Sequence, residues 1–249
     1  MQMQEQIFDA GLTATGLDAR AGEAIAITGL YRFLGRCLEE EIDRDLLRAL
    51  RGALGQSLLE TGWIMDQAFL EGPEDELLEQ LAEEFTGLFV APGGVSPYAS
   101  VFETGCMYRE PCDQVMAAYR EAGWDYRRQH TGEFPDHIGT MLCFLGELAA
   151  NESQSLEQGD TDSADTWAER RRAFLLKQIG PWAPGWCRRA AKAALLPFYR
   201  QLLGFTEQLL WLQLSEAADR RGLKELVALN QREPKKLDYD ADFRKASGI

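Results

Sequence analysis

Residues that build catalytic and metal centres are scarce in this chain of 249 residues. It has only two histidines, His130 and His137, so a histidine-rich metal site is excluded. Its five cysteines are odd in number, and no two have Cys-x-x-Cys spacing. The phosphate-binding loop, the Gly-x-Gly-x-x-Gly motif and the His-Glu-x-x-His motif are also absent. A Cys–His nucleophile pair stays open by spacing alone, but no flanking motif supports one. The sequence predicts no metal, no cofactor and no enzyme activity.

Basic charge and long apolar runs are lacking as well. Lys and Arg number 26 against 40 Asp and Glu, which gives a net charge of -14. A general nucleic-acid binder needs a basic surface, so that class is disfavoured. No apolar stretch reaches the length of a membrane span, and the first 22 residues do not have the pattern of a signal peptide. We therefore expect a cytoplasmic protein with no membrane insertion.

The alternation of a β-strand is missing too, and helical periodicity takes its place. Apolar residues recur at spacings of three and four, as at Ile27, Leu30, Tyr31, Leu34 and Leu38. A proline suited to a first helical turn precedes other such runs, as at positions 73 and 135. The sequence predicts an all-α fold in a single globular multi-helix domain.

Four parts of the chain differ in composition. We expect a flexible N-terminal extension over residues 1–21, a helical domain over 22–230 and a polar C-terminal tail over 231–249. Residues 151–166 contain five acidic residues, no basic residue and one strong apolar anchor, Leu156. This composition predicts a solvated hinge linker between an N-terminal and a C-terminal set of helices.

Two segments are candidates for a functional site, and we expect them to be neighbours in space. Ser96 to Glu103 mixes hydroxyls and aromatic rings directly after a loop rich in proline and glycine, and such loops often carry function. In Glu133-Phe134-Pro135-Asp136-His137, we expect Pro135 to open a helix and Asp136 to lie in its first turn. Each segment also has an interpretation without a functional role. The first is then a loop that packs on the core, and the second is a capped helix with a half-buried histidine.

Taken together, these segments resemble the TorD/DmsD/NarJ family of chaperones for molybdenum enzymes. Ser96 to Phe102 resembles its P-x-y-x-S-V-Y element, and Glu133 to Ile138 resembles its E-x-P-D-H-L signature. The run from Phe174 to Trp186, followed by Pro197-Phe198-Tyr199, resembles its closing helices. Phe102 departs from the pattern, because tyrosine is commoner there.

The resemblance implies a function and a partner. Family members bind the twin-arginine signal peptide, or the N-terminus, of a molybdopterin-containing oxidoreductase catalytic subunit. They hold it for cofactor insertion before export or assembly. An acidic protein with an apolar groove suits a peptide of adjacent arginines and an apolar helix-prone segment. The predicted peptide-binding residues are Tyr31, Tyr98, Ser100, Phe102, Glu133, Pro135, Asp136 and His137.

Other interpretations remain beside this one. A guanine-nucleotide-binding enzyme, a GTPase, is conceivable because some family members are said to bind guanine nucleotide, although the phosphate loop is missing. A plain helical scaffold protein is the other alternative. A monomer is favoured, and a domain-swapped homodimer is the alternative that a loose hinge and the family resemblance both suggest.

Overall fold

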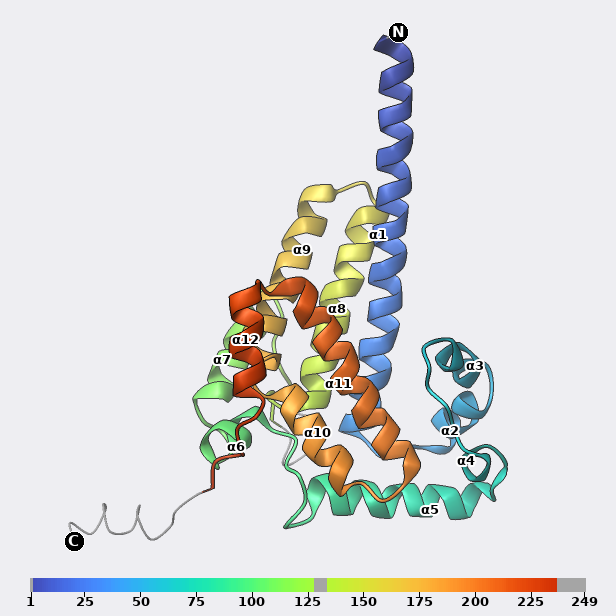
Figure 1. Ribbon diagram of the computed structural model, residues 1–249, viewed down its shortest axis with the longest axis vertical. Helices are drawn as coiled ribbons and strands as arrows, with labels where there is room; N and C mark the ends of the chain where they lie inside the picture. The colour runs from blue at the N-terminus through green and yellow to red at the C-terminus, as the bar shows by residue number, and fades with distance from the viewer. Residues whose placement is uncertain (1, 128–133, 237–249) are drawn as a thin grey trace, which may run out of the picture.

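The fold is helical throughout the part of the chain that the structure describes. The computed structural model describes residues 2–127 and 134–236, and the side chains from residue 16 onward (Figure 1). The helices in these ranges are α1 (Gln2–Glu39), α2 (Arg44–Arg51), α3 (Ala53–Glu60), α4 (Gln67–Glu71), α5 (Glu74–Phe85), α6 (Ala99–Thr104), α7 (Glu110–Glu121), α8 (Ile138–Glu157), α9 (Thr161–Phe174), α10 (Ala183–Ala193), α11 (Pro197–Ala217) and α12 (Arg220–Leu229). Two π-helical turns, η1 (Thr86–Val90) and η2 (Leu175–Ile179), extend α5 and α9. Within these ranges β pairing is limited to one isolated bridge, so the all-α prediction is confirmed.

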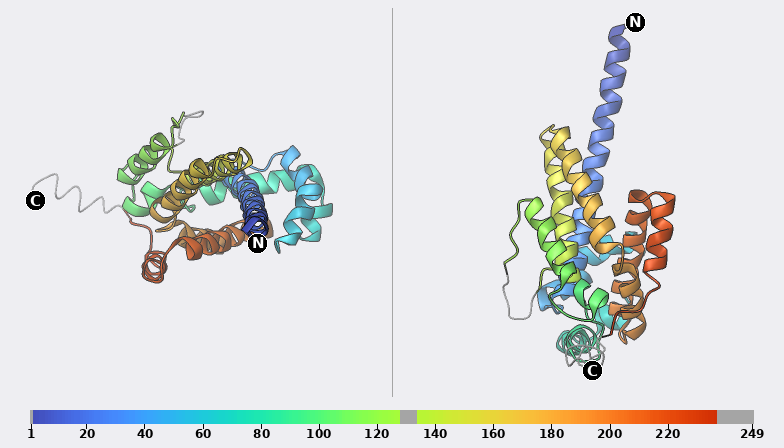
Figure 2. Two further views of the ribbon diagram at one scale, coloured as in Figure 1. Left: turned by 90° about the horizontal axis from the view of Figure 1, so that it is seen from above. Right: turned by 90° about the vertical axis from the view of Figure 1, so that its left-hand side faces the viewer.

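The long helices α1, α8 and α9 lie lengthwise beside one another, and the pair α10–α11 covers one side of them (Figures 1 and 2). The helix α5 crosses the lower end of this bundle, with the short helices α2 to α4 beside it in Figure 1. The helices α6 and α7 lie on the opposite side. Segments that are distant in sequence therefore meet at the lower end, where α8 begins.

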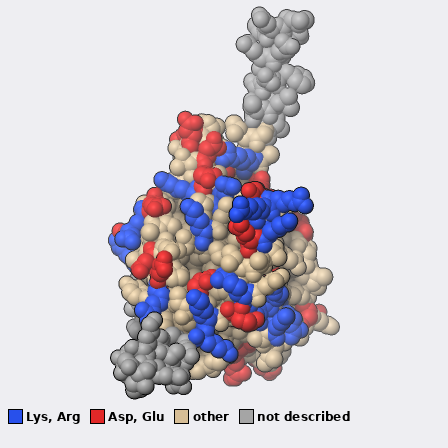
Figure 3. Space-filling model, turned by 60° about the vertical axis from the view of Figure 1, so that its left-hand side comes forward, with Lys and Arg blue, Asp and Glu red and all other residues tan. Residues whose placement is uncertain are grey.

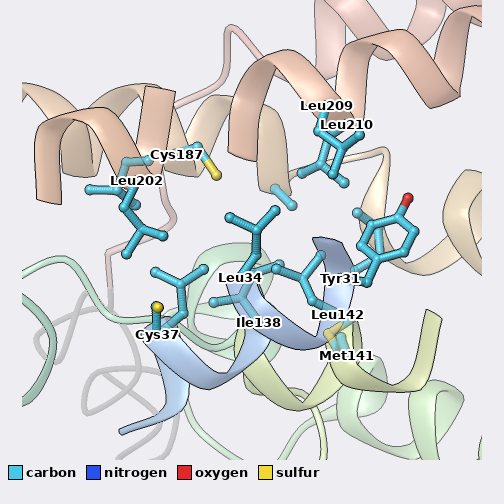
Figure 4. Close-up of a cluster of buried hydrophobic side chains, with 14 of the residues drawn as sticks. Tyr31, Leu34, Cys37, Ile138, Met141, Leu142, Cys187, Leu202, Leu209 and Leu210 are labelled. Atoms are coloured by element: carbon cyan, nitrogen blue, oxygen red, sulfur yellow. The ribbon is translucent and has the colours of Figure 1, made fainter. Parts of the chain in front are cut away.

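The core is one continuous apolar cluster between α1, α8, α10 and α11. Figure 4 shows its centre, where Leu34 and Cys37 of α1 face Ile138 and Leu142 of α8 and Leu202 of α11. All five side chains are buried completely. Burial of each aliphatic side chain stabilises the fold by roughly 1.5–3 kcal/mol, so this layer holds α1, α8 and α11 together.

Glycine allows α1 and α8 to approach closely. A Cβ atom at Gly35 would lie 2.4 Å from the sulfur of Cys143 and 2.8 Å from the carbonyl oxygen of Gly139. A Cβ at Gly139 would in turn lie 2.8 Å from the carbonyl oxygen of Gly35. Neither backbone oxygen can move without shifting its helix. These two glycines therefore set the distance between α1 and the start of α8.

The predicted hinge linker is wrong. Residues 151–166 complete α8 and begin α9, with only a short turn at residues 158–160 between the two helices. The side chain of Glu152 is 4% exposed and accepts hydrogen bonds from Arg20 at 2.9 Å and Arg171 at 3.0 Å. The basic partners that the segment lacks come from α1 and from the last turn of α9. A buried charge is stable when it is paired in this way.

Described parts of both predicted terminal segments contact the helical body. The segment 2–21, expected to be a flexible extension, belongs to α1, and Arg20 near its end pairs with Glu152. The tail begins as expected near Gln231, but Arg232 forms two hydrogen bonds to Glu103 of α6. Residues 237–249 lie outside the described residues.

The described surface carries both signs of charge. Figure 3 shows many Lys and Arg side chains on one face, with acidic side chains between them. The negative net charge of the chain is therefore not spread evenly over the molecule. Among the residues that the structure describes, no helix combines the length and the apolar character that crossing a bilayer requires.

Replacing Gly35 with alanine tests the close approach of α1 and α8. Because the new methyl group overlaps backbone oxygen, we expect Gly35→Ala to lower the free energy of unfolding by about 1–3 kcal/mol. Gly29→Ala is the matched control in the same helix, because a Cβ there meets nothing within 4 Å. That change should raise stability by about 0.5–1 kcal/mol. Chemical denaturation measures the free energy of unfolding of both variants. A loss of stability in both, or a gain in both, would show that the close approach at Gly35 does not limit the helices.

Removing Arg171 tests the buried charge cluster. Arg171→Ala leaves Glu152 buried with Arg20 as its remaining cation, and we expect a loss of about 3 kcal/mol in the free energy of unfolding. Arg32→Ala is the control, because Arg32 and Glu147 pair between α1 and α8 with exposed fractions of 52% and 42%. Such an exposed pair contributes roughly 0–1 kcal/mol. Equal losses in denaturant titrations would show that burial of Glu152 does not matter.

Candidate functional site

The two candidate segments are neighbours in space, as the sequence analysis predicts. An isolated antiparallel bridge joins Tyr98 to His137. The amide of Ile138 donates to the carbonyl oxygen of Pro97 at 2.8 Å, and the amide of Ala99 donates to the carbonyl oxygen of Asp136 at 3.1 Å. The starts of α6 and α8 are thus held against each other by backbone hydrogen bonds, and we call this region the junction.

Asp136 caps α6 from across the junction. The residue that precedes α6, Tyr98, gives it no side-chain cap. Instead, Oδ2 of Asp136 accepts a hydrogen bond from the amide of Ser100 at 2.8 Å. That amide is one of the first N–H groups of α6, which have no partner within the helix. The negative charge also lies at the positive end of the helix dipole.

The helix α8 begins three residues later than the sequence predicts. Pro135 and Asp136 form a turn, and His137 is the N-cap, with Nδ1 accepting from the amide of Gly139 at 3.1 Å. The prediction that Pro135 occupies the first turn is therefore wrong. The tertiary structure causes this difference. The hydrogen bonds to Pro97 and Ala99 hold the backbone in a non-helical conformation until Ile138.

Aromatic side chains of two other helices fix the backbone of the junction. The hydroxyl of Tyr119 on α7 donates to the carbonyl oxygen of Pro135 at 2.8 Å. The indole of Trp186 on α10 donates to the carbonyl oxygen of Ser96 at 2.8 Å. Both bonds satisfy loop carbonyls that helical hydrogen bonds cannot reach. The junction is therefore a rigid part of the fold.

Four of the eight predicted site residues are buried in it. Ser100 and Asp136 are completely buried, Phe102 is 3% exposed, and Pro135 is buried as well. Because the Asp136 side chain is completely buried, it contacts the amide of Ser100 and not the surface. Glu133 lies outside the described residues.

Tyr31 is not brought to the junction. It is completely buried beside Gly146, which lies about two turns beyond Gly139 on α8, and Figure 4 shows it near Leu209 and Leu210 of α11. Its hydroxyl has no hydrogen-bond partner among the described residues. Burial raises the pKa of that hydroxyl well above its usual range. Tyr31 belongs to the core in this structure.

The accessible side of the junction is aromatic. The ring of Tyr98 contacts His137 at 5.0 Å and Phe134 at 5.9 Å between ring centroids, and Phe134 contacts Tyr108 at 5.8 Å. The first three are partly exposed, and Tyr108 is 62% exposed. Tyr108 also has a positive φ of 57°, which is uncommon for a residue other than glycine. We call these four rings the aromatic row.

Phe134 and Tyr108 were missed by the sequence analysis. Phe134 stands inside the second motif, but it directly precedes the expected helix start at Pro135, so helical periodicity does not predict where its side chain lies. Tyr108 lies in an irregular stretch between α6 and α7, where periodicity gives no signal. Only the packing of Phe134 against Tyr98, and of Tyr108 against Phe134, identifies them.

Two polar atoms of the junction have no hydrogen-bond partner among the described residues. They are Oδ1 of Asp136 and the hydroxyl of Ser100. The thiol of Cys112 lies near Asp136, and its pKa is raised to about 12, first by burial and second by that negative charge. The thiol is therefore protonated at neutral pH and is a poor nucleophile. Within the described residues, no group of three His, Cys, Asp or Glu residues is placed to hold a metal ion.

Replacing Asp136 tests its role as a cap between segments. Asp136→Ala leaves the buried amide of Ser100 without an acceptor, and we expect a loss of about 2–3 kcal/mol in the free energy of unfolding. Asp136→Asn keeps an oxygen acceptor and should cost less. Asp160→Ala is the control, because Asp160 caps α9 in an exposed position through Ser163. It should cost about 1 kcal/mol. Thermal or chemical unfolding measures all three, and an equal cost for Asp136→Ala and Asp160→Ala would rule out the special role.

Comparison with known proteins agrees with the family resemblance of the motifs. "Chaperone protein TorD" of Photobacterium profundum is 29% identical over 134 residues, which cover 52% of this chain and 60% of that protein. The "Chlorate reductase assembly chaperone protein" of Ideonella dechloratans is 30% identical over 114 residues, covering 45% of this chain and 58% of the relative. "Chaperone protein TorD" of Colwellia psychrerythraea is 27% identical over 164 residues, covering 51% of this chain and 69% of the relative. The chain thus spans about 60% of the length of the first two relatives.

A family model described as "Nitrate reductase delta subunit" matches residues 33–188, which is more than half of the chain. The matched region contains both segments of the junction, the helices that anchor it and most of the core. This chain is therefore a member of the nitrate reductase delta subunit family.

Proposed function

We propose that this protein is a chaperone for a molybdopterin-containing oxidoreductase catalytic subunit. It binds the N-terminal segment of that subunit, in particular a twin-arginine signal peptide, and holds it while the cofactor is inserted. It acts by binding and not by catalysis, and it acts in the cytoplasm before export or assembly. The family match carries this proposal, together with the names of the relatives, which are assembly chaperones.

The junction supports the proposal by its combination of rigidity and exposure. Buried groups, above all Asp136 and Ser100, fix the backbone, so little order has to be created when a peptide binds. The aromatic row then offers the partly exposed rings of Tyr98 and Phe134 and the exposed ring of Tyr108. Aromatic faces attract guanidinium groups and also pack against apolar side chains. A peptide that has adjacent arginines before an apolar segment offers both kinds of group.

The predicted site residues have different roles in this proposal, depending on whether they are accessible or buried. Tyr98 and His137 contact the peptide at the aromatic row, whereas Ser100, Pro135 and Asp136 hold the surface in place. Tyr31 stabilises the core that supports it. Glu133 remains a predicted contact, because it directly precedes Phe134 in the chain. The protein binds its partner as a monomer, and a swapped dimer is the alternative that a size measurement on the purified protein decides.

Tyr108→Asn tests the aromatic row. Asparagine tolerates a positive φ, so this change removes the exposed ring without straining the backbone. We expect the dissociation constant for a fluorescent twin-arginine leader peptide to rise about fivefold, which corresponds to the loss of about 1 kcal/mol of ring contact. Fluorescence anisotropy measures the constant.

Two controls make this test specific. Leu212→Gln removes a side chain that is 55% exposed on α11, and it should leave the dissociation constant unchanged. A leader peptide with its two arginines replaced by glutamine should bind the unaltered protein more weakly. If the original leader peptide shows no saturable binding to the unaltered protein, the proposed function is wrong.

A further inference from the structure

The chain after α12 crosses back over α6. We call residues 231–236 the C-terminal strap. The amide of Lys235 donates to the carbonyl oxygen of Phe102 at 3.0 Å. That carbonyl belongs to the last turn of α6, where carbonyl groups have no partner within the helix. In Figure 1 the chain runs from α12 down to the side of α6 before the grey trace begins. The strap therefore joins the end of the described chain to the helix that Asp136 caps.

The strap starts from a fixed point. Asn230 is 1% exposed, and its side chain accepts from the amide of Gly185 at 2.7 Å and donates to the carbonyl oxygen of Gly180 at 2.7 Å. Arg188 donates to the carbonyl oxygen of Asn230 at 2.6 Å. Because the residue before it is tethered in this way, the strap is always close to α6 and has a high effective concentration there.

The guanidinium of Arg232 occupies a built site. Its two terminal nitrogens donate to the two carboxylate oxygens of Glu103 at 3.0 and 2.8 Å, and one of them also donates to the carbonyl oxygen of Pro181 at 3.1 Å. The ring of Phe102 lies 6.0 Å from the guanidinium carbon. A bidentate carboxylate, a carbonyl and an aromatic face are the groups that distinguish arginine from lysine.

A hollow of about 410 Å³ continues from this site toward α7. Its charged lining consists of Glu103, Glu110 and Lys177 from the body and Arg232 and Lys235 from the strap. When the strap leaves, two acids and one base of this lining remain, with Arg189 beside them over the Phe102 ring. The strap thus supplies two basic groups to a hollow whose other charges are mainly acidic.

The seated strap leaves neighbouring donors unsatisfied. Arg189 lies 4.9 Å above the Phe102 ring and donates through one nitrogen to the carbonyl oxygen of Arg232 at 2.9 Å. Its other terminal nitrogen and Nε are buried and have no partner among the described residues. The seated strap therefore does not satisfy every buried donor beside it.

We propose that Glu103, the carbonyl of Pro181 and the ring of Phe102 form an arginine-binding site for the client peptide, and that the C-terminal strap occupies this site when no client is bound. The inference rests on the proposed function, since it assumes a client segment with arginines. Binding of the client then releases the strap. The strap lowers the affinity for weakly basic peptides, because only a peptide that competes with Arg232 displaces it.

Arg232→Ala in the full chain tests the competition. The affinity for the twin-arginine leader peptide should rise about tenfold, as expected if the seated strap leaves about one molecule in ten open. Arg232→Lys keeps the charge but loses the paired hydrogen bonds, and it should give an intermediate increase. Arg221→Ala removes an arginine that is 88% exposed on α12 and should change nothing. Unchanged or weaker binding by a folded Arg232→Ala protein would overturn the proposal.

A second experiment tests Glu103 directly. In the Arg232→Ala protein, adding Glu103→Gln should weaken binding of the leader peptide about tenfold, since the charged acceptor is lost. A synthetic peptide with the sequence of residues 231–249 should compete with the leader for the Arg232→Ala protein. The same peptide with alanine in place of Arg232 should compete much less. Thermal unfolding of each variant shows whether the protein is folded.

The outcomes separate this inference from the proposed function. If the leader peptide binds with an affinity that does not change when Arg232 or Glu103 is replaced, the proposed arginine-binding site is wrong and the proposed function stands. If the tail peptide binds in a Glu103-dependent way while no leader peptide binds, the proposed function is wrong and the site on Glu103 stands.

Discussion

The contact between α1 and α8 at Gly35 and Gly139 is the constraint on which the rest of the structure depends. With no side chain on either residue, the two backbones approach until carbonyl oxygens limit them. The first turn of α8 is thereby fixed against the most buried part of α1. Since Asp136 and His137 directly precede that turn, the helix contact and the hydrogen bonds of their own side chains together fix their position.

The junction shows how two short motifs depend on each other. Neither Tyr98 nor Ser100 can cap α6 at its start, and Asp136 supplies the missing acceptor from another segment. In return, Pro97 accepts from the first amide of α8. Each helix start is therefore completed by the loop of the other. This reciprocity explains why polar residues of the motifs are buried, while their aromatic neighbours remain accessible to a peptide.

Charge is used in two ways in this acidic protein. In the interior, Glu152 joins α1 and α9 through Arg20 and Arg171, and this pairing turns an acidic, weakly apolar stretch into ordered helix. At the surface, Glu103 holds Arg232 with an exposed fraction of 39% for the arginine side chain. Burial makes the first contact costly to break, whereas exposure lets water and other cations compete for the second. The exposed contact is therefore the one suited to exchange.

The sequence by itself determined the helical class, most helix positions and the pairing of the two motifs. Helical spacing of apolar residues is a local property, and the motifs are local in sequence as well. Only the tertiary structure decided that residues 151–166 are ordered, because Arg20 and Arg171 lie far from Glu152 along the chain. It also decided that α8 starts at Ile138 and not at Pro135, that Tyr31 belongs to the core, and that Tyr108 and Phe134 join Tyr98. Each of these depends on groups that meet only after the chain has folded, and no periodicity in the sequence encodes such a meeting.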